Sequence, residues 1–439
     1  MKRSLLWLAG SLPSLAATLL VSATAPAAER LGVEEVLQLA LGSHPSLQAA
    51  RAQTRAAEER QSGARGRLLP AVSVHDEYQH WDSPFDIAIG GDAAAPPVRA
   101  RAQDTNTFTA AVSQPLLGLL GRIQDQAAQS NAAEARAAQT DVVAASLREQ
   151  LQIQYLQLFE ARAMQQVAKS SQAELAQQVT NTQVKVQAGT LTNADLLRVQ
   201  VALTNARQQE IVAVTAQSVA RAQLLSAIGR APDDASVEFL EPTQLLEQSQ
   251  HGPPKVAAAP DTRPEVVRAE REAQAAHHEE RSRFFALLPE VDLNAAYTRV
   301  DGQIFAPQNA AFIGVKADWP IWEWGATSSA HAAAREEESA ARSNVENERR
   351  RALTEVSVRR AELTAADSAV GLAREGVNSA TEAFRVTEAV VRVGSGTTTD
   401  LLDSQSALTQ ARLHLARAEY ERAIAFVQLE RAMGLHTTR

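Results

Sequence analysis

The sequence predicts a mixed α and β membrane protein with an internal duplication, in which each half contributes two strands and long paired helices. Three observations predict this fold class. Residues 115–229 recur at 320–434, so that Pro115 corresponds to Pro320. Both halves contain long runs without proline, which favour unbroken helices. Each half also contains two segments of about ten residues in which apolar and polar side chains alternate, as in strands. A repeat of this size indicates two equivalent structural halves.

The duplication extends upstream and divides the chain. The offset between the halves is 205 from Pro115 to Pro320 and 219 from Pro70 to Pro289, so the first half has 14 additional residues between its two prolines. We assign this insertion to the Pro-, Gly- and Ala-rich segment 82–105, which is expected to be a loop and not part of a strand. The expected division is a first structural repeat over 28–230, a linker or equatorial segment over 231–262, and a second repeat over 263–439.

The N-terminus carries the features of an exported protein. Lys2 and Arg3 precede an apolar run that ends near Val21, and the small-residue site at 25–27 follows. These features predict a secretory signal peptide over residues 1–27, with a retained signal anchor as the alternative.

The composition excludes several kinds of crosslink, membrane anchor and partner. The chain contains no cysteine, so neither disulfides nor a lipid-anchored cysteine are expected. The formal net charge of −8 argues against a nucleic-acid partner. After the signal segment no apolar run approaches the ~18–20 residues that a membrane-spanning helix needs. A membrane-embedded part would therefore have to consist of strands.

Helices are predicted where proline is absent and apolar side chains recur at three- and four-residue steps. Residues 195–228 have coiled-coil spacing, with small residues at several seam positions. Glycine is well placed at the turns and helix ends, as at Gly189 and Gly434. The expected helices cover about 34–68, 118–188 and 193–229 in the first half, and about 264–287, 326–392 and 399–433 in the second.

Strands are predicted at about 71–81, 107–115, 290–299 and 311–320, where the hydrophobic period changes to two. One face of these strands is apolar, and the other carries polar residues such as Glu77, Asp292, Lys316 and Asp318. About ten residues is the length of a tilted transmembrane strand. Four strands are too few to close a membrane barrel, so a barrel would have to be shared among subunits.

Aromatic residues cluster at the expected strand ends, with tryptophan at positions 81, 319, 322 and 324. Such rings gather at the two membrane–water interfaces, which favours aromatic girdles. The alternative is that they form the core of a small soluble β-sandwich. The expected membrane-interface aromatics are Trp81, Phe108, Tyr297, Trp319 and Trp322.

The repeated motifs resemble a known family. Gln114-Pro115 and Trp319-Pro320 end the strands, and an Ala-Gly-Thr turn in one half and a Gly-Ser-Gly-Thr turn in the other each precede Asp-Leu-Leu. This arrangement, from about Leu31 to Gly434, resembles the TolC family of outer-membrane efflux proteins. The resemblance implies a homotrimer with a twelve-stranded transmembrane β-barrel, four strands from each chain, continued by a long periplasmic α-helical coiled-coil barrel.

The resemblance also implies location and partners. It places the chain in the outer membrane of a Gram-negative-type bacterium, in contact with outer-membrane lipid and extending into the periplasm. The trimer would be the exit duct of a tripartite efflux pump, docked through a periplasmic adaptor (membrane fusion) protein onto an inner-membrane transporter. One alternative is the outer-membrane component of a type I protein secretion system. An alternative from another class is a soluble periplasmic coiled-coil adaptor or scaffold.

Site residues follow from the resemblance by position. The helix-tip turns that would contact the adaptor are Gly189, Thr190, Gly394, Ser395, Gly396 and Thr397, and the acidic residues at the periplasmic entrance or gate are Asp400, Asp403 and Asp195. The i, i+3 spacing places Asp400 and Asp403 on one helix face, and threefold symmetry would make two acidic rings. An ordinary helix cap is the alternative role for Asp400, and a cap or interhelical contact that for Asp195.

The two halves differ at the acidic pair, and the second half departs from the family pattern at two further positions. Arg198 stands in the first half where the second half has Asp403, so the acidic pair is confined to one half. Gly396 and Val391 occupy positions where some relatives carry a basic residue and a tyrosine that tie the entrance shut. We therefore expect different contacts, or weaker ones, to hold this entrance closed.

Enzymatic motifs are absent from the sequence. There is no P-loop, no Gly-x-Ser-x-Gly elbow and no Cys/His metal set, so neither catalysis nor a cofactor is expected. The segment His277-His278-Glu279-Glu280 lacks His-Glu-x-x-His spacing, and we expect it to be a solvated helix face and not a metal site.

Overall fold

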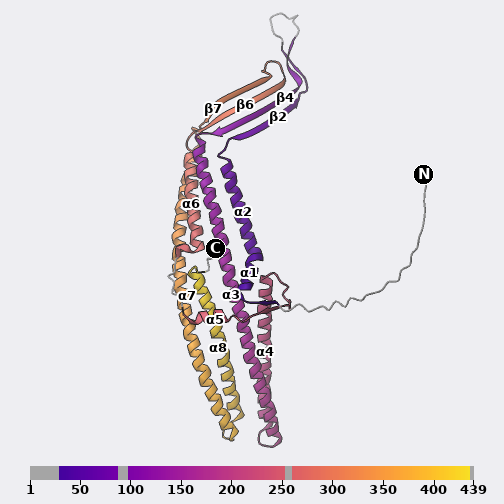
Figure 1. The fold of residues 1–439 in the computed structure, drawn as a ribbon, viewed down its shortest axis with the longest axis vertical. Coiled ribbons are helices and arrows are strands. Elements are labelled where there is room, and N and C mark those ends of the chain that lie inside the picture. Colours follow the sequence, from indigo (N-terminus) through magenta and orange to yellow (C-terminus); the bar gives the residue numbers. More distant parts are fainter. Residues whose placement is uncertain (1–28, 88–96, 253–259, 436–439) are drawn as a thin grey trace, which may run out of the picture.

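The computed structural model describes residues 29–87, 97–252 and 260–435 (Figure 1). The predicted signal peptide, part of the predicted 82–105 loop and part of the linker lie outside these residues. The described chain is elongated, with a sheet at one end and long helices that run away from it. None of the described helices is both long and apolar enough to cross a membrane.

The helices of the two halves correspond closely. In the first half α2 (Pro45–Gly66) and then α4 (Asn193–Ala227) lie along α3 (Gly118–Gln187); in the second, α6 (Pro264–Phe285) and then α8 (Thr398–Ala432) lie along α7 (Ala326–Arg392). Both α2 and α6 have 22 residues, and both α4 and α8 have 35. With 70 residues, α3 is about 105 Å long.

The prediction of one continuous helix over 34–68 is wrong, because the structure has two helices there, α1 (Val33–Ser43) and α2. His44 lies between them in an extended conformation. The following residue is Pro45, and the proline ring disfavours a helical conformation of the residue before it. Pro45 itself is accommodated in the first turn of α2, where its missing N–H would have no helical partner.

A sheet with strands from both halves joins the two repeats. Its four long strands, β2 (Ala71–His80), β4 (Val98–Pro115), β6 (Glu290–Gln303) and β7 (Asn309–Asp318), pair in that order and all antiparallel. The central pair, β4 and β6, brings together one strand from each half. The strands β2 and β7 form the two edges.

The assignment of residues 82–105 to a loop is wrong for part of this segment. The strand β3 (Phe85–Ile87) pairs with the beginning of β4, which starts at Val98 and not near residue 107. An ion pair of 3.2 Å between Arg99 and Asp86 supports this pairing. Composition failed here because the Pro-, Gly- and Ala-rich residues are only the middle of the segment, and the flanks extend the hairpin.

The strand register places like side chains on the same face. Val112 faces Val72 on one side and Ala295 on the other, and Ala295 faces Ile313, which makes a continuous apolar face. The opposite, polar face contains Ser73, His75, Glu77, Thr107, Thr109, Asn294, Thr298 and the Asp292–Lys316 pair. Among the described residues, no helix or second sheet covers either face (Figure 1). The sheet is therefore a single layer with two chemically different surfaces.

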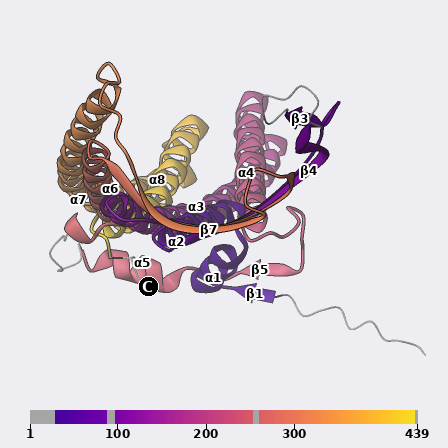
Figure 2. The same ribbon diagram turned by 90° about the horizontal axis from the view of Figure 1, so that it is seen from above.

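The main hydrophobic core lies midway along the helices and not under the sheet. There β1 (Glu29–Leu31) pairs in parallel with β5 (Val237–Phe239), and both pack with α1 and α5 (Thr243–Gln250) against the long helices. Figure 2 shows these four elements on one side of the helical layer. The segment after residue 231 thus contains ordered elements, which include a 3₁₀ turn at Pro260–Thr262.

Tyr155 is the polar centre of this core. Its fully buried hydroxyl lies 3.0 Å from the Leu31 carbonyl oxygen and 2.5 Å from that of Leu240, so it connects α3 to β1 and to the residue that follows β5. Burial, followed by the negative charge of Glu35, raises the pKa of the Tyr155 hydroxyl well above its ordinary range. The hydroxyl therefore keeps its proton and remains a donor.

We predict that Tyr155→Phe lowers the free energy of unfolding by about 1–3 kcal/mol, because buried carbonyl groups lose a donor. Guanidinium denaturation followed by circular dichroism measures the change. Tyr420→Phe is the matched control: Tyr420 is buried in the same core, and in the described structure its hydroxyl has no hydrogen bond. Its loss should be close to zero, and equal losses in the two variants would contradict the role given to the Tyr155 hydroxyl.

Candidate functional site

The candidate site is the pair of helix tips at the end of the molecule far from the sheet (Figure 1). Each tip is a glycine turn between a long helix and its shorter partner. Gly189 and Gly394 have φ values of 75° and 81°, a left-handed conformation that glycine adopts without steric cost. The next N–H in each turn, from Thr190 or Ser395, donates to the carbonyl oxygen of Lys185 or Val390 five residues earlier. Both long helices therefore end with the same C-terminal cap.

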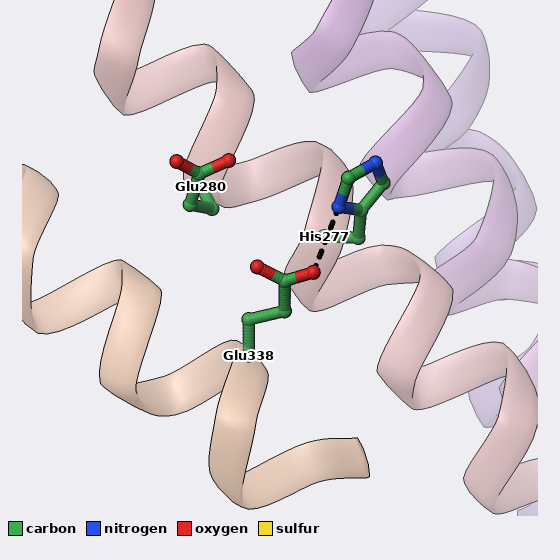
Figure 3. Close-up of side chains that lie close together, drawn as sticks. All are labelled: His277, Glu280 and Glu338. Atoms are coloured by element: carbon green, nitrogen blue, oxygen red, sulfur yellow. Dashed lines mark hydrogen bonds and ion pairs between the residues drawn. The ribbon is translucent and has the colours of Figure 1, made fainter.

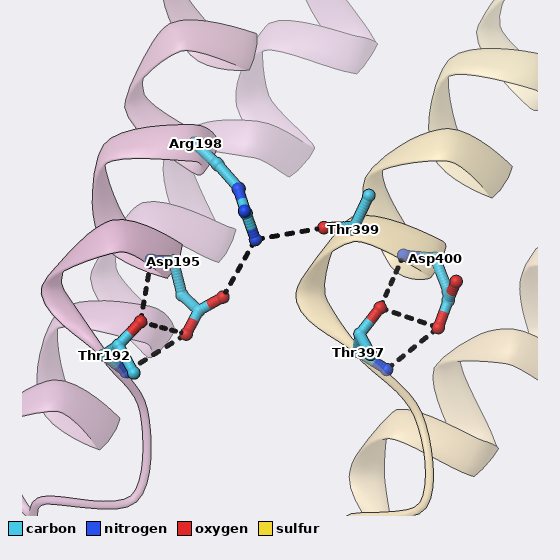
Figure 4. A network of polar contacts seen from close by, with 6 residues as sticks. All are labelled: Thr192, Asp195, Arg198, Thr397, Thr399 and Asp400. Carbon is cyan, nitrogen blue, oxygen red and sulfur yellow. Dashed lines mark hydrogen bonds and ion pairs between the residues drawn. The ribbon is translucent and has the colours of Figure 1, made fainter.

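Each shorter helix begins with a capping box (Figure 4). In the first, the Asp195 N–H donates to the Thr192 hydroxyl at 3.3 Å, and the Thr192 N–H donates to the Asp195 carboxylate at 3.1 Å. In the second, the same two bonds join Thr397 and Asp400 at 3.1 and 3.0 Å. The carboxylates of Asp195 and Asp400 thus occupy equivalent positions and satisfy backbone donors that no helical carbonyl reaches.

These bonds affect the charge of the tips. The hydroxyl and the backbone N–H of Thr397 lower the pKa of the Asp400 carboxyl, and those of Thr192 lower the pKa of Asp195. Because the folded-state pKa is lowered, the capping contribution is complete above the ordinary aspartate range and is lost as the pH falls through the lowered value. Both carboxylates are therefore charged at neutral pH.

The first tip contacts the second through Arg198. Its Nη1 donates to the Thr399 hydroxyl at 3.2 Å and lies 3.7 Å from a carboxylate oxygen of Asp195 (Figure 4). Asp403, the counterpart of Arg198 in the second half, is exposed one turn after Asp400. The structure thus brings Asp195 and Asp400 to adjacent tips, but it gives only the first of them a basic partner.

The side chains of Val390 and Val391 leave little room for a side chain at Gly396. A Cβ at this position would lie 2.9 Å from Cγ2 of Val391 and 3.2 Å from Cγ1 of Val390. A larger residue would require these valines to move. Positions 396 and 391, which both depart from the family pattern, therefore lie next to each other.

The sequence interpretation missed Thr192 and Thr399. Thr192 carries a local signal, since a threonine three residues before an aspartate at a helix start is the pattern of a capping box. Thr399 carries no such signal, because its contact with Arg198 joins residues about two hundred positions apart.

The aromatic residues lie at two levels of the sheet. Phe108 and Tyr297 belong to the apolar face towards its far end, and Trp319 and Trp322 follow β7 beside the helices. All four are exposed. Trp81 differs, because its indole Nε1 donates to Thr105 at 3.1 Å and the Arg101 guanidinium lies 3.6 Å from its ring centroid. Thr105 belongs to the polar face, so Trp81 does not share the apolar surface of the other rings.

Comparison with known proteins identifies the family. Residues 36–230 and 257–435 match the family model described as outer membrane efflux protein, which covers most of the chain and both repeats. The chain belongs to the outer membrane efflux protein family. This confirms the resemblance seen in the sequence and the predicted outer-membrane location, and it places the chain among ducts and not among enzymes.

Similar proteins are consistent with this membership. Outer membrane efflux protein BepC of Brucella suis is 24% identical over 287 residues, which span 64% of this chain and 62% of BepC. The aligned part thus covers less than two thirds of that relative. The crystal structure of CusC gives a TM-score of 0.80 at 15% identity and covers 92% of both chains. That of VceC from Vibrio cholerae gives 0.78 at 16% identity, over 92% of this chain and 96% of VceC. At these identities the two structures show a common fold.

One feature of this family member differs from the sequence-based expectation. The segment 277–280 was expected to be a solvated helix face, but the structure packs most of it against other helices. His278 Nδ1 lies 2.8 Å from the Gln124 side-chain oxygen on α3, and His277 Nδ1 lies 2.8 Å from a Glu338 oxygen on α7. The expectation was wrong because α6 is covered on two sides, by α3 and α7.

We predict that Arg198→Ala loosens the contact between the two tips of this outer membrane efflux protein. The lost contacts are partly exposed, so the effect should be below about 1 kcal/mol, or up to about fivefold faster amide hydrogen exchange. Mass spectrometry of exchange in residues 188–200 and 393–403 measures it. Arg207→Ala on the exposed part of α4 is the control and should leave both tips unchanged. Unaltered exchange at residues 393–403 in Arg198→Ala would show that Arg198 does not couple the tips.

Proposed function

We propose that three copies of the chain form an outer-membrane exit duct, which passively conducts substrates from an inner-membrane pump and a periplasmic adaptor to the outside. The observation that carries this proposal is the single-layer sheet with one apolar face, one polar face and two unpaired edges. Family membership supports the outer-membrane part of the proposal.

The apolar face requires a nonaqueous environment. Val72 and Ile313 are 73% and 75% exposed in the single chain, and Val74 and Val315 beside them are also exposed. Contiguous apolar surface of this kind is stabilised by transfer out of water. Lipid provides that environment on the apolar face, while the polar face, with Glu77 and the Lys316–Asp318 ion pair, suits a water-filled lumen.

The sheet edges support a trimer. Along β2 and β7, one side of each backbone has no partner strand in the described chain, and such edges are not tolerated in lipid. Both edges are satisfied when β2 of one copy pairs with β7 of the next. Four strands from each of three copies give a barrel of twelve, within the size range of membrane barrels. Phe108, Tyr297, Trp319 and Trp322 then lie at the two membrane interfaces, as girdle residues do.

The helices offer surfaces for the same assembly. Val201, Ile211 and Val212 on α4 and Leu372 and Val386 on α7 are exposed apolar residues of the long helices in the single chain. Neighbouring copies would cover them by the same helix packing that joins α3 to α4 and α7 to α8. A continuous helical tube below the barrel follows from this packing.

The soluble adaptor or scaffold alternative requires a different sheet. A soluble protein would have to bury the apolar side in a two-layer β-domain. In the described chain that side is uncovered, which favours the duct. Drug export and type I protein export can use the same duct, so the proposal names the conduit and not its cargo.

The tips supply the proposed entrance. Gly189, Thr190 and residues 394–397 are the turns that would contact the adaptor. Asp400 and Asp403 would form two acidic rings around the threefold axis, which attract cations and hinder anions. Since the Asp400 carboxylate is already engaged by the capping box, Asp403 is the residue whose charge has no such structural task.

A cysteine scan tests the barrel, and the cysteine-free chain gives it no background. We predict that Ser73→Cys on β2, combined in turn with cysteine at each polar-face position of β7 from Ala310 to Lys316, yields an oxidised covalent trimer in one register. A disulfide requires Cβ atoms about 3.8 Å apart, so neighbouring registers should not react. Denaturing electrophoresis measures the product.

The control for this scan is Val72→Cys with the same β7 partners, because Val72 lies on the other face of β2. It should give no trimer. Covalent dimers without trimers, or no product in any register, would contradict the twelve-stranded assembly.

We predict that Asp403→Asn weakens block of the channel by a trivalent cation at least tenfold, because one of the two proposed charged rings is removed. Single-channel recording in planar bilayers measures the block. Asp367→Asn, an exposed position on α7 away from the tips, should leave it unchanged. Identical block in both variants would remove Asp403 from the entrance.

A further inference from the structure

A cluster of histidine and glutamate side chains lies between α6 and α7, far from the tips. His277, Glu280 and Glu338 each offer one atom able to bind a metal, and these three atoms lie within 4.8 Å of one another. Figure 3 shows His277 and Glu280 on α6 facing Glu338 on α7. The proposed duct function gives these residues no task.

Helix geometry explains why the sequence brings them together. His277 and Glu280 are three residues apart, and so lie on the same face of α6. His331 and Glu338 are seven residues apart, or about two turns, on one face of α7. The two faces meet, with His277 Nδ1 at 2.8 Å from a Glu338 oxygen and His331 Nε2 at 2.8 Å from a Glu280 oxygen.

The cluster holds two carboxylates that are largely removed from water. The side chains of Glu338 and Glu280 are 10% and 18% exposed. Arg342 forms an ion pair with Glu338. In the described chain Arg342 is the one arginine or lysine that pairs with either carboxylate, so two negative charges face one guanidinium. Carboxylates in such surroundings are stabilised by a bound cation or by protonation of their partners.

We propose that His277, Glu280 and Glu338 bind a divalent transition-metal ion of the zinc class. Imidazole nitrogen and carboxylate oxygen are ligands that Zn²⁺ accepts, and three protein ligands leave a fourth position for water. Ligand atoms about 2.0 Å from a tetrahedral ion are separated by about 3.3 Å. His277 Nδ1 and a Glu338 oxygen are 2.8 Å apart and all three ligand atoms lie within 4.8 Å of one another, so side-chain rotations can reach this value.

His331 has a supporting place in this site. Its Nε2 contacts Glu280, and it would orient that carboxylate as hydrogen-bonded partners of metal ligands do. On binding, the ion takes the place of the hydrogen bond between His277 Nδ1 and Glu338, and the neutral imidazole carries its proton on Nε2. The bound ion joins α6 to α7 near the sheet, in a chain without cysteine to crosslink its helices.

Titration calorimetry with Zn²⁺ tests the site, on the full-length detergent-purified protein after treatment with a chelator. We expect one ion per chain, and His277→Gln or Glu338→Gln should weaken binding at least tenfold. His278→Gln is the matched control: this neighbour contacts Gln124 on α3 and does not belong to the cluster. Absence of saturable binding, or equal loss in His278→Gln, would overturn the proposal.

A second measurement does not depend on the folding of any variant. Zinc X-ray absorption of the loaded parent protein should show one imidazole together with oxygen ligands. A spectrum without imidazole scattering would overturn the assignment, as would Mg²⁺ binding with the same affinity, because Mg²⁺ prefers oxygen ligands alone. Zn²⁺ should also raise the thermal midpoint of the parent and of His278→Gln, but not that of His277→Gln.

Discussion

Backbone hydrogen bonding at the edges of the sheet constrains the whole molecule. The strands β2 and β7 have donors and acceptors that no described part of the chain satisfies, and the sheet between them has an apolar face without a covering layer. A single half would supply one hairpin with the same defect. The duplication places two hairpins side by side through β4 and β6, but it moves the unpaired edges outwards and does not remove them. In the proposed duct, pairing with further copies satisfies these edges in lipid.

The helices follow from the same duplication and carry most of the buried surface. The pairs α2 with α6 and α4 with α8 have equal lengths, so the two halves extend equally far from the sheet. The halves differ most around Tyr155, where β1, β5, α1 and α5 pack on one side of the helical layer. This core fixes the position of the segment between the repeats.

Periodicity and proline spacing predicted much of this fold, because both report on the backbone. Alternation placed Val72, Val112 and Ile313 on one face, and the register shows them paired across the sheet. The helix break at His44 was not predicted, although the following Pro45 disfavours a helical conformation there. The start of β4 was not predicted because the residues before it are rich in proline, glycine and alanine. The Arg198–Thr399 contact and the His277–Glu338 contact join distant segments. Nothing local in the sequence encodes such pairs.

The two tips have the same turn and helix cap but differ in charge. Both have the same glycine turn and the same threonine–aspartate box, which therefore serve to end one helix and begin the next. One turn further on the halves diverge: Arg198 balances Asp195, whereas Asp403 adds a second negative charge to Asp400. In the proposed trimer, three nearly neutral tips alternate with three doubly negative ones. The charge of the entrance then comes from the second repeat, while the Arg198 guanidinium of the first repeat contacts the adjacent tip at Thr399.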